Sequence, residues 1–198
     1  MHARSTFRLG PLLAVTGVGL LIVGTALHPM QADPAVAEAA FAEYAADRHW
    51  VVSHLIQLAG VWAMIASLLL LARGLDTGPA APWAALGRAF GIAGIAAAAA
   101  LQAVDGVALK MMVDQWAAAT EPEKSALFAA AYGVRQIEIG LAGMSCLVLG
   151  LTTAIFGLAL VIDGRFPKWA GLLGVAGGIS TAVSGVARDG AHDEGFHC

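Results

Sequence analysis

Three apolar stretches of this chain each carry two polar side chains that stand three residues apart. The pairs are His54 with Gln57, Gln102 with Asp105, and Arg135 with Glu138. Residues three apart share one face of a helix, so each pair should turn to a single side. Ionisable groups are costly inside a membrane and are tolerated mainly along substrate, ion and proton pathways. Three helices that each offer one polar face could therefore enclose a functional cavity.

Two functional chemistries fit these groups. His54, Asp105 and Glu138 could titrate together in a proton relay or a proton-coupled carrier, which requires no fixed motif. A haem or transition-metal site would use His28 and His54 as nitrogen ligands beside a carboxylate, although no H-x-x-x-H or H-E-x-x-H spacing supports it. Hydrolase chemistry is disfavoured, because adjacent Ser53 and His54 point apart on a helix and the chain has no G-x-S-x-G motif. Binding, transport or a structural role is therefore favoured over catalytic turnover.

The same polar side chains could instead be structural. Arg135 and Glu138 could form an ion pair that anchors a helix end near the water interface. Asp105 and Lys110 could do the same, and His54 could bond a neighbouring backbone carbonyl. The protein would then be a structural or accessory subunit of a larger membrane complex.

The polar end of the chain, residues 188–198, carries a second group of possible metal ligands. His192, His197 and Cys198 lie within seven residues, and short His/Cys tracts can chelate transition metals. A solvated tail without a ligand is the alternative. The other cysteine, Cys146, lies in an apolar run, so no intrachain disulfide is predicted.

The composition is that of a membrane protein. Hydrophobic residues make up 59% of the chain and charged residues only 13%, whereas a soluble domain has roughly a quarter charged residues. The formal net charge of −3 and the lack of a basic run argue against nucleic acid as a partner. The expected partners are the lipid bilayer and a membrane protein or a second copy of this chain.

Five apolar runs predict an all-α bundle of five transmembrane helices. The predicted spans cover residues 9–27, 50–72, 89–112, 137–161 and 169–186. Each is close to the roughly 20 residues that cross a bilayer. They would form one domain, residues 1–187, followed by the polar tail, residues 188–198. The first run could alternatively be a secretory signal peptide, because Arg4 and Arg8 precede it and Ala-Val-Ala at residues 35–37 resembles a cleavage site.

The segments between the spans carry their own signals. Residues 33–48 predict a short amphipathic helix that lies on the outer membrane face, packs over the mouth of the bundle or binds a partner. Residues 73–88 predict a loop with an interfacial Trp83, because they are rich in glycine and proline. Glu-Pro-Glu at residues 121–123 predicts a helix start, followed by an exposed or re-entrant portion up to Gln136.

The fifth predicted span is rich in glycine. Gly174 and Gly178 form a G-x-x-x-G pair that Ala182 continues on the same face. Small residues let helix backbones approach closely in lipid. We therefore expect this span to be buried against other helices, and we interpret the motif as packing rather than specific dimerisation.

The distribution of basic residues predicts the orientation. With five spans, one side of the membrane would hold Arg4, Arg8, Arg73, Arg88, Arg165 and Lys168. The other side would hold Arg48, Lys110, Lys124, Arg135 and Arg188, spread over longer segments. By the positive-inside rule the first side is cytoplasmic. The N-terminus would then lie in the cytoplasm and the C-terminus outside.

This orientation places the polar side chains at similar depths in the outer half of the membrane. His28 would end the first span there, and the pairs on the next three spans would lie nearby. We therefore predict that five side chains converge in one outer-half pocket: His28, His54, Gln57, Asp105 and Glu138. Gln102 and Arg135 would flank it.

The order of motifs in the first third of the chain resembles that of a known class of proteins. His28-Pro29 ends the first span, an acidic segment follows, and Trp50-x-x-x-His54 opens the second span. This order resembles small multi-pass bacterial membrane proteins classed only as domains of unknown function. The resemblance implies a bacterial inner (cytoplasmic) membrane and carries no activity or catalytic residue.

Overall fold

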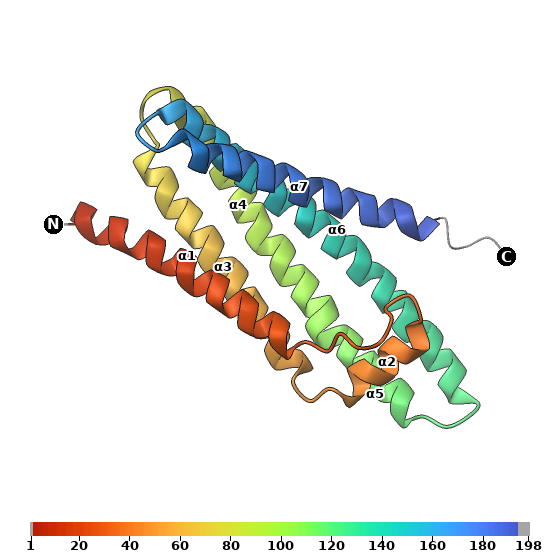
Figure 1. Ribbon diagram of the computed structural model, residues 1–198. Helices are drawn as coiled ribbons and strands as arrows, with labels where there is room; N and C mark the ends of the chain where they lie inside the picture. Colours follow the sequence, from red (N-terminus) through yellow and green to blue (C-terminus); the bar gives the residue numbers. More distant parts are fainter. Residues whose placement is uncertain (1, 194–198) are drawn as a thin grey trace.

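The computed structural model describes residues 2–193, with side-chain surroundings for residues 9–187, and these residues form helices and no strand (Figure 1). The α-helices are α1 (His2–Leu27), α2 (Ala37–Ala46), α3 (Trp50–Gly74), α4 (Ala81–Gln102), α5 (Lys110–Ala118), α6 (Glu123–Asp163) and α7 (Lys168–Asp193). A 3-10 helix η1 (Gly78–Ala80) precedes α4, and a π-helix η2 (Ala103–Leu109) joins α4 to α5. The prediction of an all-helical bundle is confirmed.

Five helical stretches of the described chain are long and apolar enough to cross a membrane. They are Leu9–Leu27, Trp50–Gly74, Gly78–Ala118, Glu123–Asp163 and Lys168–Ala187. Large apolar side chains such as Leu12, Val15 and Leu173 remain exposed on the outside of the bundle. Such a surface fits contact with lipid and is unusual for a soluble monomer. By length and composition the chain is a multi-pass membrane protein.

Two predicted boundaries around the third span are wrong. Residues 73–88 do not form one long loop, because α4 already begins at Ala81 and includes Trp83. Pro82 lies in the first turn of α4, where a proline has no hydrogen bond to lose and its fixed φ suits the helix. The same helical stretch also continues through η2 and α5 to Ala118, beyond the predicted end at Met112.

Helix α6 is a single continuous helix of 41 residues. It starts at Glu123, directly after Pro122, as the Glu-Pro-Glu signal predicted. The portion before Gln136 is not re-entrant. It extends α6 and packs against α2 and α5, with Ala131 fully buried and Phe128 in contact with their core.

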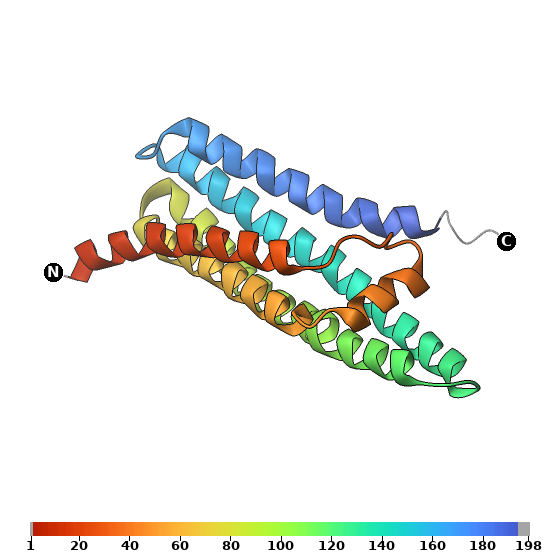
Figure 2. The ribbon, with the colours of Figure 1, turned by 60° about the horizontal axis from the view of Figure 1, so that its bottom comes forward.

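The fifth span packs closely against the fourth, as predicted from its glycines. Figure 2 shows α7 running along α6, with α1 along α3 on the other side of the bundle. A Cβ atom on Gly174 would lie 3.0 Å from the Cα of Gly157, and one on Gly178 would lie 2.5 Å from the carbonyl oxygen of Gly150. Only glycine lets the two backbones approach this closely.

The end of the chain differs in part from the predicted tail. Helix α7 continues to Asp193, so the first residues of the predicted polar tail are helical. His197, Cys198 and the side chain of His192 lie outside the described residues. The tail metal site and the absence of a bridge between Cys146 and Cys198 therefore stay predictions.

Helix α2 packs over one end of the bundle. It starts at Ala37, three residues after the predicted proline, and buries Phe41 and Tyr44. The Phe41 ring lies 6.1 Å from Trp116 of α5 and 5.5 Å from Phe128 of α6, centroid to centroid. Lys110 Nζ donates to the carbonyl oxygens of Tyr44 and Ala45 near the C-terminus of α2. These contacts use the apolar face of α2 inside the chain.

Candidate functional site

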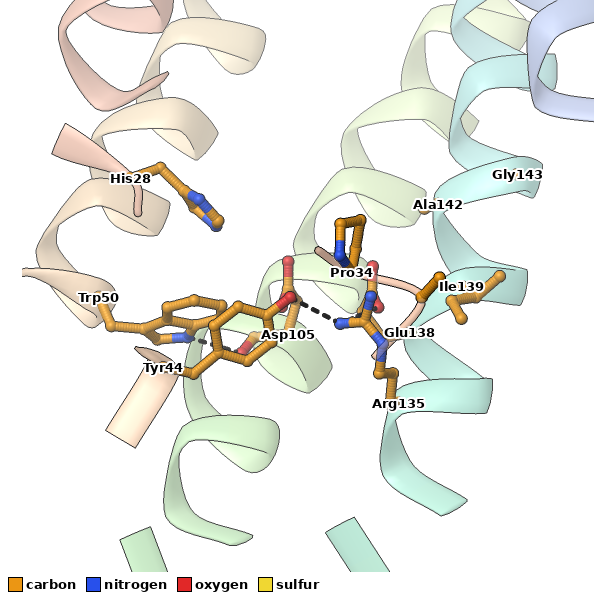
Figure 3. Close-up of a pocket in the computed structure, with 11 residues that line it drawn as sticks. His28, Pro34, Tyr44, Trp50, Asp105, Arg135, Glu138, Ile139, Ala142 and Gly143 are labelled. Atoms are coloured by element: carbon orange, nitrogen blue, oxygen red, sulfur yellow. Dashed lines mark hydrogen bonds and ion pairs between the residues drawn. The ribbon is translucent and has the colours of Figure 1, made fainter. Parts of the chain in front are cut away.

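A cavity of about 570 Å³ opens beneath α2 (Figure 3), at the end of the bundle opposite the connections between α3 and α4 and between α6 and α7 (Figure 1). Its lining comes from the ends of α1 and α3, the α1–α2 segment, α2, η2 and α6. The lining residues are His28, Pro34, Ala35, Tyr44, Trp50, Asp105, Arg135, Glu138, Ile139, Ala142 and Gly143. Figure 3 shows Tyr44 directed toward Arg135 and Trp50 directed toward Asp105.

The π-helix η2 positions Asp105. A π-helix has one extra residue per hydrogen-bonded turn, and such turns occur frequently at functional sites. The backbone carbonyl of Asp105 accepts a hydrogen bond of 3.0 Å from Trp50 Nε1. Gly106 lets α3 approach η2, because a Cβ atom on Gly106 would lie 2.8 Å from the Cβ of His54. The sequence reasoning missed this π-helix, since glycine and aspartate give no specific signal for it.

His54 and Asp105 form a close contact between two ionisable side chains beside the cavity. His54 Nε2 lies 3.0 Å from Asp105 Oδ2, and the exposed fractions of the two side chains are 2% and 19%. His54 Nδ1 lies 2.6 Å from the carbonyl oxygen of Trp50. His54 is thus enclosed behind the cavity wall, and Asp105 connects it to the cavity.

His28 lies at the same end of the bundle, as predicted. Its Nδ1 lies 2.8 Å from the carbonyl oxygen of Pro29. Its ring centroid lies 5.0 Å from that of His54 and 4.8 Å from that of Trp50. Among the described residues, no group of three or more His, Cys, Asp or Glu side chains could hold a metal ion. The His28 and His54 metal site is therefore not supported by the described geometry.

Arg135, Tyr44 and Glu138 form a polar group on the α6 side. Arg135 Nη1 donates a hydrogen bond of 2.9 Å to Tyr44 Oη and lies 3.9 Å from Glu138 Oε2. The Arg135 and Glu138 side chains are only 13% and 15% exposed. Burial raises the pKa of the Tyr44 phenol above its ordinary value, although the nearby Arg135 opposes this shift. Tyr44 therefore stays a neutral hydroxyl at physiological pH.

Three predicted site residues, His54, Gln57 and Gln102, are not among the lining residues, and His54 reaches the cavity only through its contact with Asp105. Gln57 turns toward α1, where its Cγ would lie 2.7 Å from a Cβ atom on Gly24. Gln102 Oε1 is buried and forms no hydrogen bond with any described residue. A Cβ atom on Gly106 would lie 3.6 Å from Gln102 Oε1 and 2.8 Å from the Cβ of His54, so Gln102 turns toward the contact between η2 and α3.

The structure corrects one of the contacts that the structural interpretation predicted. Lys110 does not pair with Asp105, because its Nζ lies 2.7 Å from Asp114 Oδ1, one turn further along. Asp105 pairs with His54 instead. The predicted bond from His54 to a neighbouring carbonyl is present, at Trp50. Arg135 and Glu138 also lie close together, as both the structural and the functional interpretations expected.

Sequence reasoning missed Tyr44 and Trp50 as cavity residues. Tyr44 lies within the predicted amphipathic helix and Trp50 begins a predicted span, and neither place by itself indicates a cavity residue. A usable signal for Trp50 was its position four residues before His54, which places the two rings on one helix face. Their ring centroids are 4.6 Å apart. Nothing in the sequence indicated that Tyr44 would reach Arg135 from another helix.

Comparison of the chain with protein-family models, with curated proteins and with solved structures finds no match. The functional argument therefore depends on the geometry of the cavity itself.

Proposed function

We propose that this protein is an integral membrane protein that binds and transports a small molecule through the cavity beneath α2. The observation that carries the proposal is the convergence of Asp105, Arg135 and Glu138, all at least four-fifths buried, on one cavity. Burying charged side chains in a membrane-spanning bundle is costly, and such groups are kept mainly where they serve a ligand or ion path. The volume of about 570 Å³ falls within the usual range of roughly 300–1,000 Å³ for small-molecule sites.

The test compares two tryptophan substitutions on α6. Ala142→Trp would fill the cavity, because Ala142 is one of its lining residues. Gly140→Trp is the matched control, since Gly140 is exposed and no described atom lies within 4 Å of a Cβ atom built there. Both variants should fold in detergent. A panel of primary amines, carboxylates, alcohols and sugars is then screened for thermal stabilisation of the purified protein, and each ligand found is tested for uptake into vesicles that contain the protein.

The expected result is that a ligand stabilises the parent protein and the Gly140→Trp variant but not the Ala142→Trp variant. Uptake should follow the same pattern. If no compound stabilises the parent protein, the binding proposal fails and the role of a structural or accessory subunit is favoured. If Ala142→Trp still binds the ligand, the ligand occupies another site.

We further propose that the cavity faces the outside of a bacterial cytoplasmic membrane. The proposal is supported by Arg73, Arg165 and Lys168, which gather at the opposite end of the bundle, because basic residues favour the cytoplasmic side. A reporter fused after Cys198 should then report an extracytoplasmic C-terminus. A cytoplasmic signal from this fusion would reverse the orientation.

A further inference from the structure

The hydrogen-bond partners of His54 determine how many protons its ring holds. The carbonyl oxygen of Trp50 lies 2.6 Å from Nδ1, and a carbonyl oxygen can only accept. Ser53 Oγ already donates to the same carbonyl at 2.8 Å, so it does not supply a proton to His54. If Nδ1 carried no proton, its lone pair would face a lone pair of the Trp50 carbonyl oxygen. Nδ1 therefore carries a proton.

The contact between His54 and Asp105 requires a second proton. Nε2 and Oδ2 are 3.0 Å apart, which is a hydrogen-bond distance only if one proton lies between them. The pair is then either an imidazolium with a carboxylate or an imidazole with a carboxylic acid. In both forms it holds one proton more than a neutral imidazole beside a carboxylate. Asp105, which is 19% exposed, gives this proton a route to the cavity.

The charged and titratable groups around the pair leave the site electrically balanced. They are Glu138 and Arg135 of α6, Tyr44 of α2, His28 after α1, and Lys110 of α5 with its partner Asp114. Arg135 offsets the charge of Glu138, and the neutral Tyr44 adds none. The proton of the His54–Asp105 pair offsets the charge of Asp105. A cation that entered the cavity would therefore leave one uncompensated positive charge unless a proton departed.

Beside the Arg135 guanidinium, the cavity presents several hydrogen-bond acceptors. Asp105 uses Oδ2 for His54, which leaves Oδ1 for the cavity, and Glu138 forms no hydrogen bond of normal length with any described residue. His28 donates from Nδ1 to the carbonyl of Pro29, so its Nε2 is an acceptor in the neutral ring. The Trp50 and Tyr44 ring centroids are 4.3 Å apart, and the Arg135 guanidinium lies over the Tyr44 ring.

We infer that the ligand is a small organic ammonium ion whose binding to Asp105 and Glu138 is exchanged for the proton of the His54–Asp105 pair. The inference rests on the proposed function and specifies its ligand class. In the exchange, the bond that holds the shared proton breaks and the proton leaves to water. The ammonium N–H groups donate to the carboxylates in its place, so Asp105 exchanges its hydrogen bond with His54 Nε2 for one with the ammonium and the two side chains move apart. One positive charge enters and one leaves, and no oxidant or reductant is involved.

The test uses the full-length protein in detergent micelles and three probes of similar size: 2-phenylethylammonium, 2-phenylethanol and 3-phenylpropionate. Titration calorimetry in two buffers with different ionisation enthalpies gives the number of protons released per bound probe. The ammonium probe should bind with the release of about one proton near neutral pH, and its apparent affinity should rise about tenfold per pH unit. The alcohol and the carboxylate should not bind.

Two histidine variants form a matched pair. His54→Gln removes the shared proton but keeps Asp105, so the ammonium probe should still bind while the proton count falls to near zero. His28→Gln leaves the His54–Asp105 pair intact, so its proton count should stay near one. The count measured on the parent protein decides the question even if His54→Gln does not fold.

Each outcome bears on a different part of the inference. Ammonium binding without proton release overturns the exchange. Binding of the alcohol or the carboxylate in place of the ammonium overturns the ligand class and leaves the binding function intact. If none of the three probes binds, the ligand class fails, and the proposed function fails with it only if the wider compound panel also gives no stabilisation.

Discussion

Replacing Gly178 by alanine should destabilise the protein, whereas the same change at the adjacent Gly177 should not. A Cβ atom on Gly178 would lie 2.5 Å from the carbonyl oxygen of Gly150 and 2.8 Å from the Cβ of Ala154. No described atom lies within 4 Å of a Cβ atom on Gly177. The two positions belong to the same stretch of α7, so they differ mainly in their contact with α6.

The size of the effect follows from these distances. Ordinary van der Waals contact begins near 3.4 Å, so the contact with the Gly150 oxygen must open by about 0.9 Å. That oxygen belongs to the backbone, so no flexible side chain can yield and the helices themselves must shift. Overpacking of this kind costs roughly 1–3 kcal/mol. Replacing glycine by alanine inside a helix contributes about 0.5–1 kcal/mol of stability at both positions.

The difference between the two variants isolates the packing cost. Gly178→Ala should be about 1–3 kcal/mol less stable than Gly177→Ala, which is roughly a 5- to 150-fold difference in the folding equilibrium. Equilibrium unfolding in mixed detergent micelles, followed by circular dichroism, measures it. Gly178→Leu should be more severe still. Equal stability of the two alanine variants would refute the close contact between α6 and α7.

Two further variants test the site. Gly106→Ala should lower the free energy of unfolding by roughly 1–3 kcal/mol relative to Gly133→Ala. The methyl group at position 106 would lie 2.8 Å from the Cβ of His54, whereas no described atom lies within 4 Å of a Cβ atom on Gly133. Equal unfolding midpoints of the two variants would contradict the close contact between η2 and α3. Burial raises the Tyr44 pKa, so the neutral phenol contributes stability below about pH 10 that is lost as the pH rises through the folded-state pKa. As the pH is raised from about 9 to about 11, the denaturation midpoint of the parent protein should therefore decrease. Tyr44→Phe should remove the part of this decrease that the Tyr44 phenol causes. An unchanged pH profile in Tyr44→Phe would assign the fall to other groups.

The number of membrane-spanning helices was predictable because it depends on local composition. Each span is an uninterrupted run of apolar residues, and the cost of placing such a run in lipid is close to a sum over its own residues. The close packing of α7 was predictable for a similar reason. Gly174 and Gly178 have no side-chain volume, so a helix that carries them on one face gains stability only by direct backbone contact.

The helix boundaries were less predictable. Proline reads as a breaker in sequence, but Pro82 lies in the first turn of α4, where it fits. The π-helix between α4 and α5 left no signal in residue type. The structure places Asp105 in the cavity lining and leaves Gln102 out of it.

The sequence by itself determined that polar residues on several spans share one end of the bundle, since depth follows from distance along each helix. Only the tertiary structure decided which of them meet. The rotation of each helix about its axis depends on its neighbours, and Gly106 lets α3 come close enough for His54 to reach Asp105. The same packing directs Gln57 toward α1 and brings Tyr44, from a helix outside the spans, to Arg135. Such pairings join residues far apart in sequence, so no local pattern specifies them.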